Sequence, residues 1–129
     1  MIRRTRPGHD SYLTTPGGGR LAGETPEEAA ARECAEELGA EITVGPVAFV
    51  AYGPEPDSWV QHFYLARLDA IDPARRTGHE FSEPERGQYE TIHVGHDDAK
   101  TLALLRPPEL RWILATHGRH LAAEAAALA

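Results

Sequence analysis

Apolar and polar residues alternate in several short runs, the pattern expected of strands that bury one face. Five such runs stand out, and the fourth is especially rich in aromatic and β-branched residues. They cover Ile2 to Thr5, Ser11 to Thr15, Ile42 to Tyr52, Trp59 to Leu68 and Thr91 to Val94. We expect the third and fourth to pair as antiparallel neighbours, with Gly45-Pro46 marking a bulge or break in the third.

A helix is predicted between Pro26 and Leu38, because the residues at both of its ends have the chemistry of helix caps. Thr25 is a good N-cap, and Glu28 completes a capping box three residues later. Proline is common at the first helical position, where its missing N–H costs nothing. Gly39 supplies the left-handed residue that closes many helices.

Two further helices are predicted toward the C-terminus. One opens at Asp97, and another begins at Pro107-Pro108 and runs to about His117, before Gly118. The polar segment from Asp69 to Gln88 reads as one long loop, and loops of this length are usually functional or disordered. We expect a functional one. Strands and helices in mixed order predict an α/β sandwich.

Size and composition narrow the class of protein. The 129 residues are the right number for one domain, 1–129, and a content of 41% hydrophobic and 26% charged residues is typical of a globular protein. No apolar run approaches the roughly 20 residues that span a bilayer, so we expect no membrane segment. The opening residues do not resemble a secretory signal, which makes a cytoplasmic location the expectation. A net charge of −7 argues against a nucleic-acid partner.

Three acidic residues share one face of the predicted Pro26 to Leu38 helix. On a helical wheel Glu33, Glu36 and Glu37 fall within about 100° of each other. Glutamates on a helix are most often simply solvated. Crowded carboxylates also repel one another, however, and a hard cation such as Mg²⁺ relieves that repulsion through oxygen ligands.

The residues around this acidic face favour the metal-binding interpretation. Gly18, five residues, Glu24, seven residues and then the run from Arg32 to Ala40 form a window that resembles the Nudix box position for position. Seven fixed identities match, and at about 10% for each the chance of that is on the order of 10⁻⁷ per window. Cys34 and Ala40 stand where the family prefers Ile, Leu or Val, a departure that affects packing more than chemistry.

The resemblance to the Nudix hydrolase family implies a fold, namely an α/β/α sandwich with a mixed β-sheet. Members normally have a strand ahead of the segment that corresponds to residues 1–7, so the N-terminal strand is expected to be missing. An uncovered sheet edge or core face is commonly filled by another chain. We therefore expect a homodimer, which sedimentation at micromolar concentration tests.

The resemblance also implies a metal site. The side chains of Glu33, Glu36 and Glu37, joined by the main-chain carbonyl of Gly17, are expected to bind Mg²⁺ or Mn²⁺ beside the substrate diphosphate. Arg32 is expected to hold the neighbouring carboxylate in place. Three further residues are expected to support the site; they are Gly18, Glu24 and Gly39.

Two assignments keep alternatives open. Glu33 is the first choice of general base, and a loop glutamate is the second, with Glu85 in the register of some relatives and Glu80 and Glu83 as substitutes. These loop acids are as readily explained as solvated residues. Arg4 is a candidate for binding substrate phosphate, although basic residues at a strand end more often face solvent.

The activity implied by the resemblance is hydrolysis of the diphosphate linkage of a nucleoside diphosphate joined to another moiety. Nucleoside triphosphates, nucleotide sugars and ADP-ribose are the candidate substrates, because the box contacts only the diphosphate. Among the aromatic residues of one strand, Trp59, Phe63 and Tyr64, one is a candidate to face a nucleobase, with core packing as the alternative. The competing hypothesis for the whole protein is a nucleotide-sensing module that binds without cleaving.

Overall fold

A four-stranded mixed sheet forms one side of the molecule in the computed structural model, which describes residues 1–56, 58–78, 81 and 83–129. The strand order is β5-β1-β2-β6. These strands are β1 (Ile2–Thr5), β2 (Tyr12–Thr14), β5 (Gln88–Thr91) and β6 (Leu105–Arg106). β1 pairs antiparallel with both of its neighbours, whereas β2 and β6 are parallel. The predicted mixed sheet is confirmed.

The second sheet is one long antiparallel hairpin of β3 (Ala40–Tyr52) and β4 (Val60–Ile71). The expected pairing of these two segments is confirmed. The register shifts between Val44 and Val47, where Gly45-Pro46 predicted a bulge. Both strands reach further than expected at the end where Ala40 pairs with Ile71, since pairing continues as far as the end of the preceding helix.

Helix α1 (Pro26–Leu38) has the bounds and the caps that the sequence predicted. The Thr25 hydroxyl accepts a hydrogen bond from the Glu28 amide at 3.1 Å, and the Glu28 carboxylate accepts one from the Thr25 amide at 2.9 Å. Gly39 ends the helix in the left-handed conformation, with φ of 64°. This capping fixes where the acidic face of α1 begins and ends.

The C-terminal helices differ from their predicted bounds. The first of them, α2, spans Ala99–Leu102 with Asp98 as N-cap, and α3 (Glu109–Ala126) does not end near His117. Gly118 is not a cap, because it lies inside α3 where the helix meets the His96 side chain. A Cβ at Gly118 would overlap that side chain. The glycine allows a close approach between two segments, so the prediction of a helix end there was wrong.

The predicted strand at Thr91 to Val94 was also misplaced. β5 occupies Gln88–Thr91, because each of its residues pairs with one residue of β1, from Thr5 opposite Gln88 to Ile2 opposite Thr91. The preceding loop is shorter than expected, mainly because β4 extends to Ile71 and also because β5 already begins at Gln88. Its described residues include the short 3₁₀ helices η1 (Pro73–Arg75) and η3 (Pro84–Arg86).

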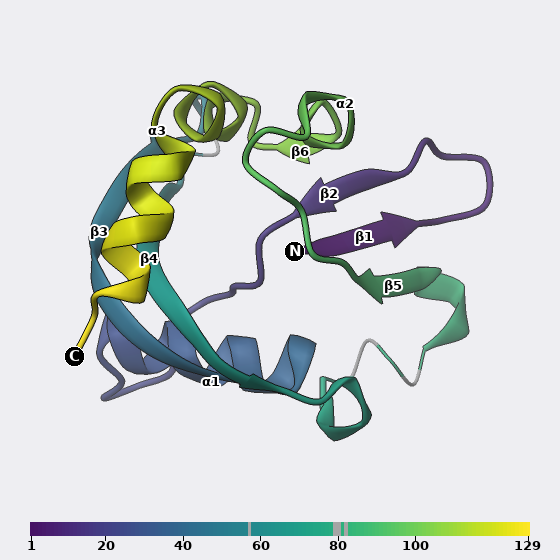
Figure 1. The fold of residues 1–129 in the computed structure, drawn as a ribbon. Helices are drawn as coiled ribbons and strands as arrows, with labels where there is room; N and C mark the ends of the chain where they lie inside the picture. The colour runs from purple at the N-terminus through teal and green to yellow at the C-terminus, as the bar shows by residue number, and fades with distance from the viewer. Residues whose placement is uncertain (57, 79–80, 82) are drawn as a thin grey trace.

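Among the described residues, two apolar clusters join the sheets to the helices. The first has buried leucines from β2, α2, β6 and α3, with Phe49 and Phe63 of the long hairpin packed against them. The second joins Ile2 of β1, Leu38 of α1 and Ala40 of β3. In Figure 1 the hairpin curves along the left, the four-stranded sheet lies on the right, α1 at the bottom and α3 at the upper left. Both helices contact the hairpin, α1 mainly through β3 and α3 through β4.

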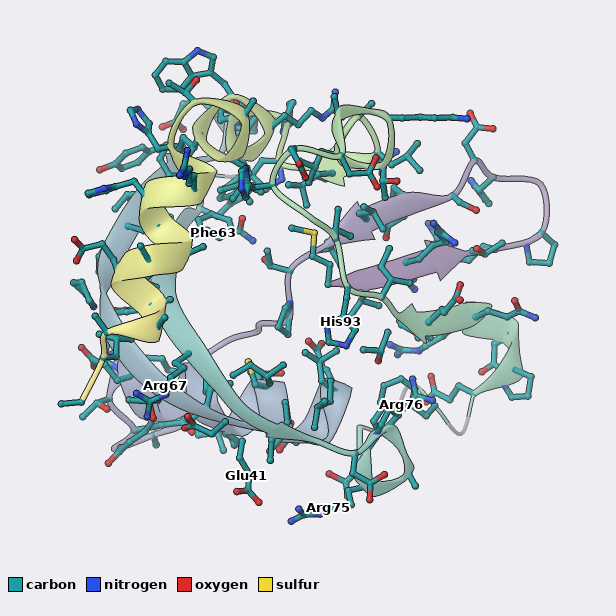
Figure 2. The ribbon with its side chains drawn as sticks, viewed as in Figure 1. Glu41, Phe63, Arg67, Arg75, Arg76 and His93 are labelled. Atoms are coloured by element: carbon teal, nitrogen blue, oxygen red, sulfur yellow. The ribbon has the colours of Figure 1, made fainter. Side chains whose placement is uncertain are left out.

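The alternative left open for the aromatic residues of β4 is settled at one position. Phe63 is part of the core, 5.9 Å from Phe49 between ring centroids, so core packing was the correct explanation for this aromatic residue (Figure 2). Within the described ranges, no helix is long and apolar enough to cross a membrane.

Gly39→Ala should destabilise the protein more than Gly8→Ala, which serves as the matched control. Both glycines have positive φ, which costs a side-chain-bearing residue about 1 to 2 kcal/mol. A Cβ at Gly39 would also overlap the Asp72 main-chain carbonyl, whereas one at Gly8 meets nothing within 4 Å. Urea unfolding measures both losses, and equal losses would contradict this account of the α1 cap.

Candidate functional site

The acidic face of α1 forms part of a cleft with a volume of about 410 Å³. Four of its lining residues come from α1, namely Arg32, Glu33, Glu36 and Glu37. The others are Arg4 from β1, Arg86 from η3 and Tyr89 from β5. The cleft therefore brings together segments that are more than 80 residues apart in the sequence.

The glycine loop before α1 folds against two of these carboxylates. The Gly17 amide donates a hydrogen bond to Oε2 of Glu37 at 2.9 Å. A Cβ at Gly18 would overlap the Glu33 carboxylate, whereas one at Gly19 meets nothing within 4 Å. A side chain at position 18 would therefore displace the Glu33 carboxylate from its place beside the loop.

Arg32 is hydrogen-bonded to three carboxylates and to the glycine loop. Its Nε donates to Glu24 at 2.7 Å, and its Nη1 donates to Glu33 at 2.9 Å and to Glu36 at 3.1 Å. Its Nη2 donates to the Gly19 carbonyl at 2.9 Å. Charge-assisted hydrogen bonds of this kind are stronger than neutral ones. The side chain therefore ties the loop and the helix into one unit.

These contacts shift the titration of the groups involved. The hydrogen bond from Arg32 is the main cause of a lowered pKa of Glu24, and the Leu21 amide adds to it at 2.8 Å. The pKa of Arg32 is raised in turn, first by Glu24 and then by Glu33. Both members of the pair are charged at neutral pH.

The side of α1 that faces away from the cleft is apolar and holds Cys34, one of the two departures from the family pattern, while the other, Ala40, begins β3. Cys34 packs beside Leu38 and Ala40 in the second apolar cluster. Burial raises the pKa of the Cys34 thiol to about 11, and the charge of Glu37 adds to the effect. The thiol is therefore neutral and fills the position of an aliphatic residue.

Arg4 brings positive charge into the same cleft. Its Nη1 donates to the Tyr12 hydroxyl at 3.3 Å, and its guanidinium carbon lies 4.9 Å from the centroid of the Tyr89 ring. Its Nε is buried and has no hydrogen-bond partner among the described residues. The side chain is thus held by a ring and a hydroxyl, neither of which neutralises its charge.

The structure places Arg86, and not Glu85, among the described residues that line the cleft. Glu85 is exposed on η3. Glu83 forms an ion pair with Arg86, and Glu80 lies outside the described residues. The sequence interpretation looked for loop acids alone and so missed both Arg86 and Tyr89. The only signal for them was their place in the same loop and strand.

The oxygen donors of α1 have the chemistry that suits a hard divalent cation. Glu33 and Glu37 both contact the glycine loop, as the metal-site hypothesis requires. Across the described part of the chain, no three side chains of His, Cys, Asp or Glu lie close enough together to hold a metal ion. Glu33 and Glu36 instead pair with Arg32, so a cation that they bind would compete with this arginine.

Comparison with models of protein families shows which family the chain belongs to. The family model described as NUDIX domain matches residues 1–112, a range that includes every residue lining the cleft. The chain belongs to the Nudix family. No curated protein matches it. Nudix proteins generally use divalent metal ions and act on small nucleotide-type substrates, and the mixed α/β fold described above agrees with this membership.

The stabilising effect of the Glu24 and Arg32 pair should depend on pH in a defined direction. Because the pKa of Glu24 is lowered in the folded protein, its contribution is complete above the ordinary pKa of a glutamate. This contribution to stability is lost as the pH falls through the lowered pKa of Glu24. The difference in free energy of unfolding between wild type and Glu24→Gln should therefore shrink on acidification.

Urea unfolding at a series of pH values from about 7 to about 3 measures this difference. Arg32→Met should reduce the same pH dependence, because Arg32 is the main cause of the lowered pKa. A difference between wild type and Glu24→Gln that stays constant over the whole range would contradict the assignment.

Proposed function

We propose that the chain is a Mg²⁺-dependent Nudix pyrophosphohydrolase that cleaves the diphosphate linkage of a nucleoside diphosphate joined to another group. The observation that carries the proposal is the composition of the cleft, in which three box carboxylates lie with two arginines from other elements. Carboxylates suit a divalent cation, and arginines suit phosphate oxygens. A diphosphate bound through a metal satisfies both requirements.

The metal would be held by Glu33, Glu36 and Glu37, with the main-chain carbonyl of Gly17 as a further ligand. When bound, Mg²⁺ neutralises part of the diphosphate charge and lowers the pKa of a coordinated water. Mn²⁺ has similar oxygen preferences and is expected to substitute.

The protein's own groups then position the reactants. Arg32 holds Glu33 and Glu36 by hydrogen bonds and also binds the glycine loop, and Glu24 orients Arg32 from the other side. Glu33 is our first choice of general base. It accepts the proton of the attacking water as the water oxygen bonds to phosphorus, and the bond from phosphorus to the leaving phosphate ester breaks. Glu85 is the second choice, reached only if η3 moves toward the cleft.

Arg4 and Arg86 would bind the phosphate oxygens that the metal does not. Arg4 has a guanidinium without a carboxylate partner among the described residues, which leaves its donors for a substrate anion. Arg86 pairs with Glu83 on its own loop. A phosphate that binds Arg86 therefore exchanges one anionic partner for another, and Arg4 should contribute more to affinity.

Substitution of the box carboxylates tests the proposed activity. Glu33→Gln, Glu36→Gln and Glu37→Gln should each lower kcat/KM by about 100-fold or more, the range associated with losing a general base or metal contact. Glu27→Gln is the matched control, because Glu27 is an exposed glutamate of the same helix outside the cleft. The assay follows products from nucleoside triphosphates, nucleotide sugars and ADP-ribose with Mg²⁺ and with EDTA.

Binding of these compounds without any Mg²⁺-dependent product would overturn the enzyme proposal and favour the nucleotide-sensing module. Full activity in Glu37→Gln would show that the metal site is wrongly assigned. Full kcat in Glu85→Gln would leave Glu33 as the general base.

Arg4→Met should raise KM by about 10-fold while changing kcat less, because a charge-assisted hydrogen bond to phosphate contributes about 1.5 to 3 kcal/mol. Arg3→Met is the control, since Arg3 lies on the same strand but pairs with Glu90 and does not line the cleft. Steady-state kinetics on the best substrate gives both constants. An unchanged KM in Arg4→Met would remove this residue from substrate binding.

A further inference from the structure

The long hairpin of β3 and β4 has two faces, and the helices cover them unequally. Successive residues of a strand point to opposite faces, so the register of the hairpin assigns each pair of residues to one face. Phe49 and Phe63 pair on the inner face and pack with leucines of α3, which lies along the hairpin (Figure 1). The other face contacts α1 near the start of β3, where Ile42 packs against Leu38. Toward the tip of the hairpin, the described side chains on that face are exposed or half-buried.

Three directly opposed residue pairs make up this exposed area, which we name the outer hairpin face. They are Tyr52 with Val60, Val50 with His62, and Val47 with Tyr64. The most exposed of the apolar side chains are Tyr52 at 75%, Val60 at 53% and Val47 at 44%. The six residues include no Asp, Glu, Lys or Arg. Because opposed and neighbouring pairs on one face contact each other, the outer hairpin face is a continuous strip that is mainly apolar.

The chain exposes more surface than is usual for a monomer of its mass. Its accessible surface is 8321 Å², whereas a monomeric protein of 14.1 kDa exposes about 6,700 Å². The excess is about 1,600 Å², and each partner in a standard protein interface buries about 800 Å². The area available for a contact with another molecule is therefore large enough for a stable complex.

A second copy of this chain is the partner that the outer hairpin face fits. An interface with two-fold symmetry brings the same surface of both copies together, so the apolar strip of one copy meets the apolar strip of the other. The chain has a net charge of −7, and two copies repel each other where their acidic surfaces meet. A contact through a face that has no acidic residue avoids this repulsion. Sheets also pack well face to face, at a distance of about 10 Å.

We propose that the outer hairpin face is the interface of a homodimer in which the hairpins of two copies pack face to face. This assigns a surface to the homodimer that the sequence led us to expect. None of the six residues lines the acidic cleft, so the cleft stays open in the dimer. The inference goes beyond the proposed function and does not depend on it.

Sedimentation equilibrium of the full chain at micromolar concentration tests the proposal. The wild-type protein should have twice the mass of the 14.1 kDa chain. Val60→Lys brings like charges together across the two-fold axis and should raise the Kd of the dimer by about 10-fold or more. Leu21→Lys is the matched control, because Leu21 is 61% exposed in the loop before α1 and should leave the Kd within about 2-fold.

A second variant guards against a folding defect in the first. Tyr52→Lys changes the residue opposite Val60 on the other strand and should weaken the dimer in the same way. Circular dichroism of both variants should match that of the wild-type protein, because both side chains are exposed. A wild-type protein that stays monomeric would overturn the proposal. A dimer that forms equally well in folded Val60→Lys and Tyr52→Lys would also overturn it, since another surface would then join the copies.

The outcomes are separable from those of the activity assays. Sedimentation needs no turnover, so a chain that hydrolyses none of the candidate substrates can still confirm or refute the interface. A monomeric chain with Mg²⁺-dependent hydrolysis would support the enzyme and refute the interface.

Discussion

The site depends on one guanidinium held among like charges. Arg32 lies within hydrogen-bonding distance of Glu24, Glu33 and Glu36 and also binds the Gly19 carbonyl. Without it, carboxylates three and four residues apart on one helix would repel one another, and the glycine loop would lose one of its polar contacts with α1. The loop can approach because position 18 has no side chain. Arg32 and Gly18 therefore determine where the glutamates of α1 lie even when no ligand is bound.

The rest of the fold brings other charges to this acidic face. Arg4 comes from β1 and Arg86 from the loop that leads into β5, and the four-residue pairing of β1 with β5 places both beside α1. The second apolar cluster also holds β1 against α1, because Ile2 of β1 packs with Leu38 at the end of α1. Acidic and basic groups therefore meet in one cleft. This combination suits a ligand that brings both a cation and an anionic diphosphate.

What could be predicted from the sequence was local. The caps of α1 and the shared face of its glutamates depend on residues three to four positions apart, so Thr25, Glu28 and Gly39 were sufficient to define them. The errors involved partners far away in the sequence. Gly118 was taken for a helix end because its contact with His96 was not visible, and β5 was placed three residues too late because its register is set by β1. Arg86 and Tyr89 enter the site only through that register.

The central claim is that the carboxylates of α1 form a divalent-cation site, and a Mn²⁺ titration followed by electron paramagnetic resonance tests it most directly. The account predicts that the wild-type protein binds Mn²⁺, that Mg²⁺ displaces it, and that Glu36→Gln and Glu37→Gln each weaken binding while Glu27→Gln does not. Unaltered Mn²⁺ affinity in both cleft variants would contradict it.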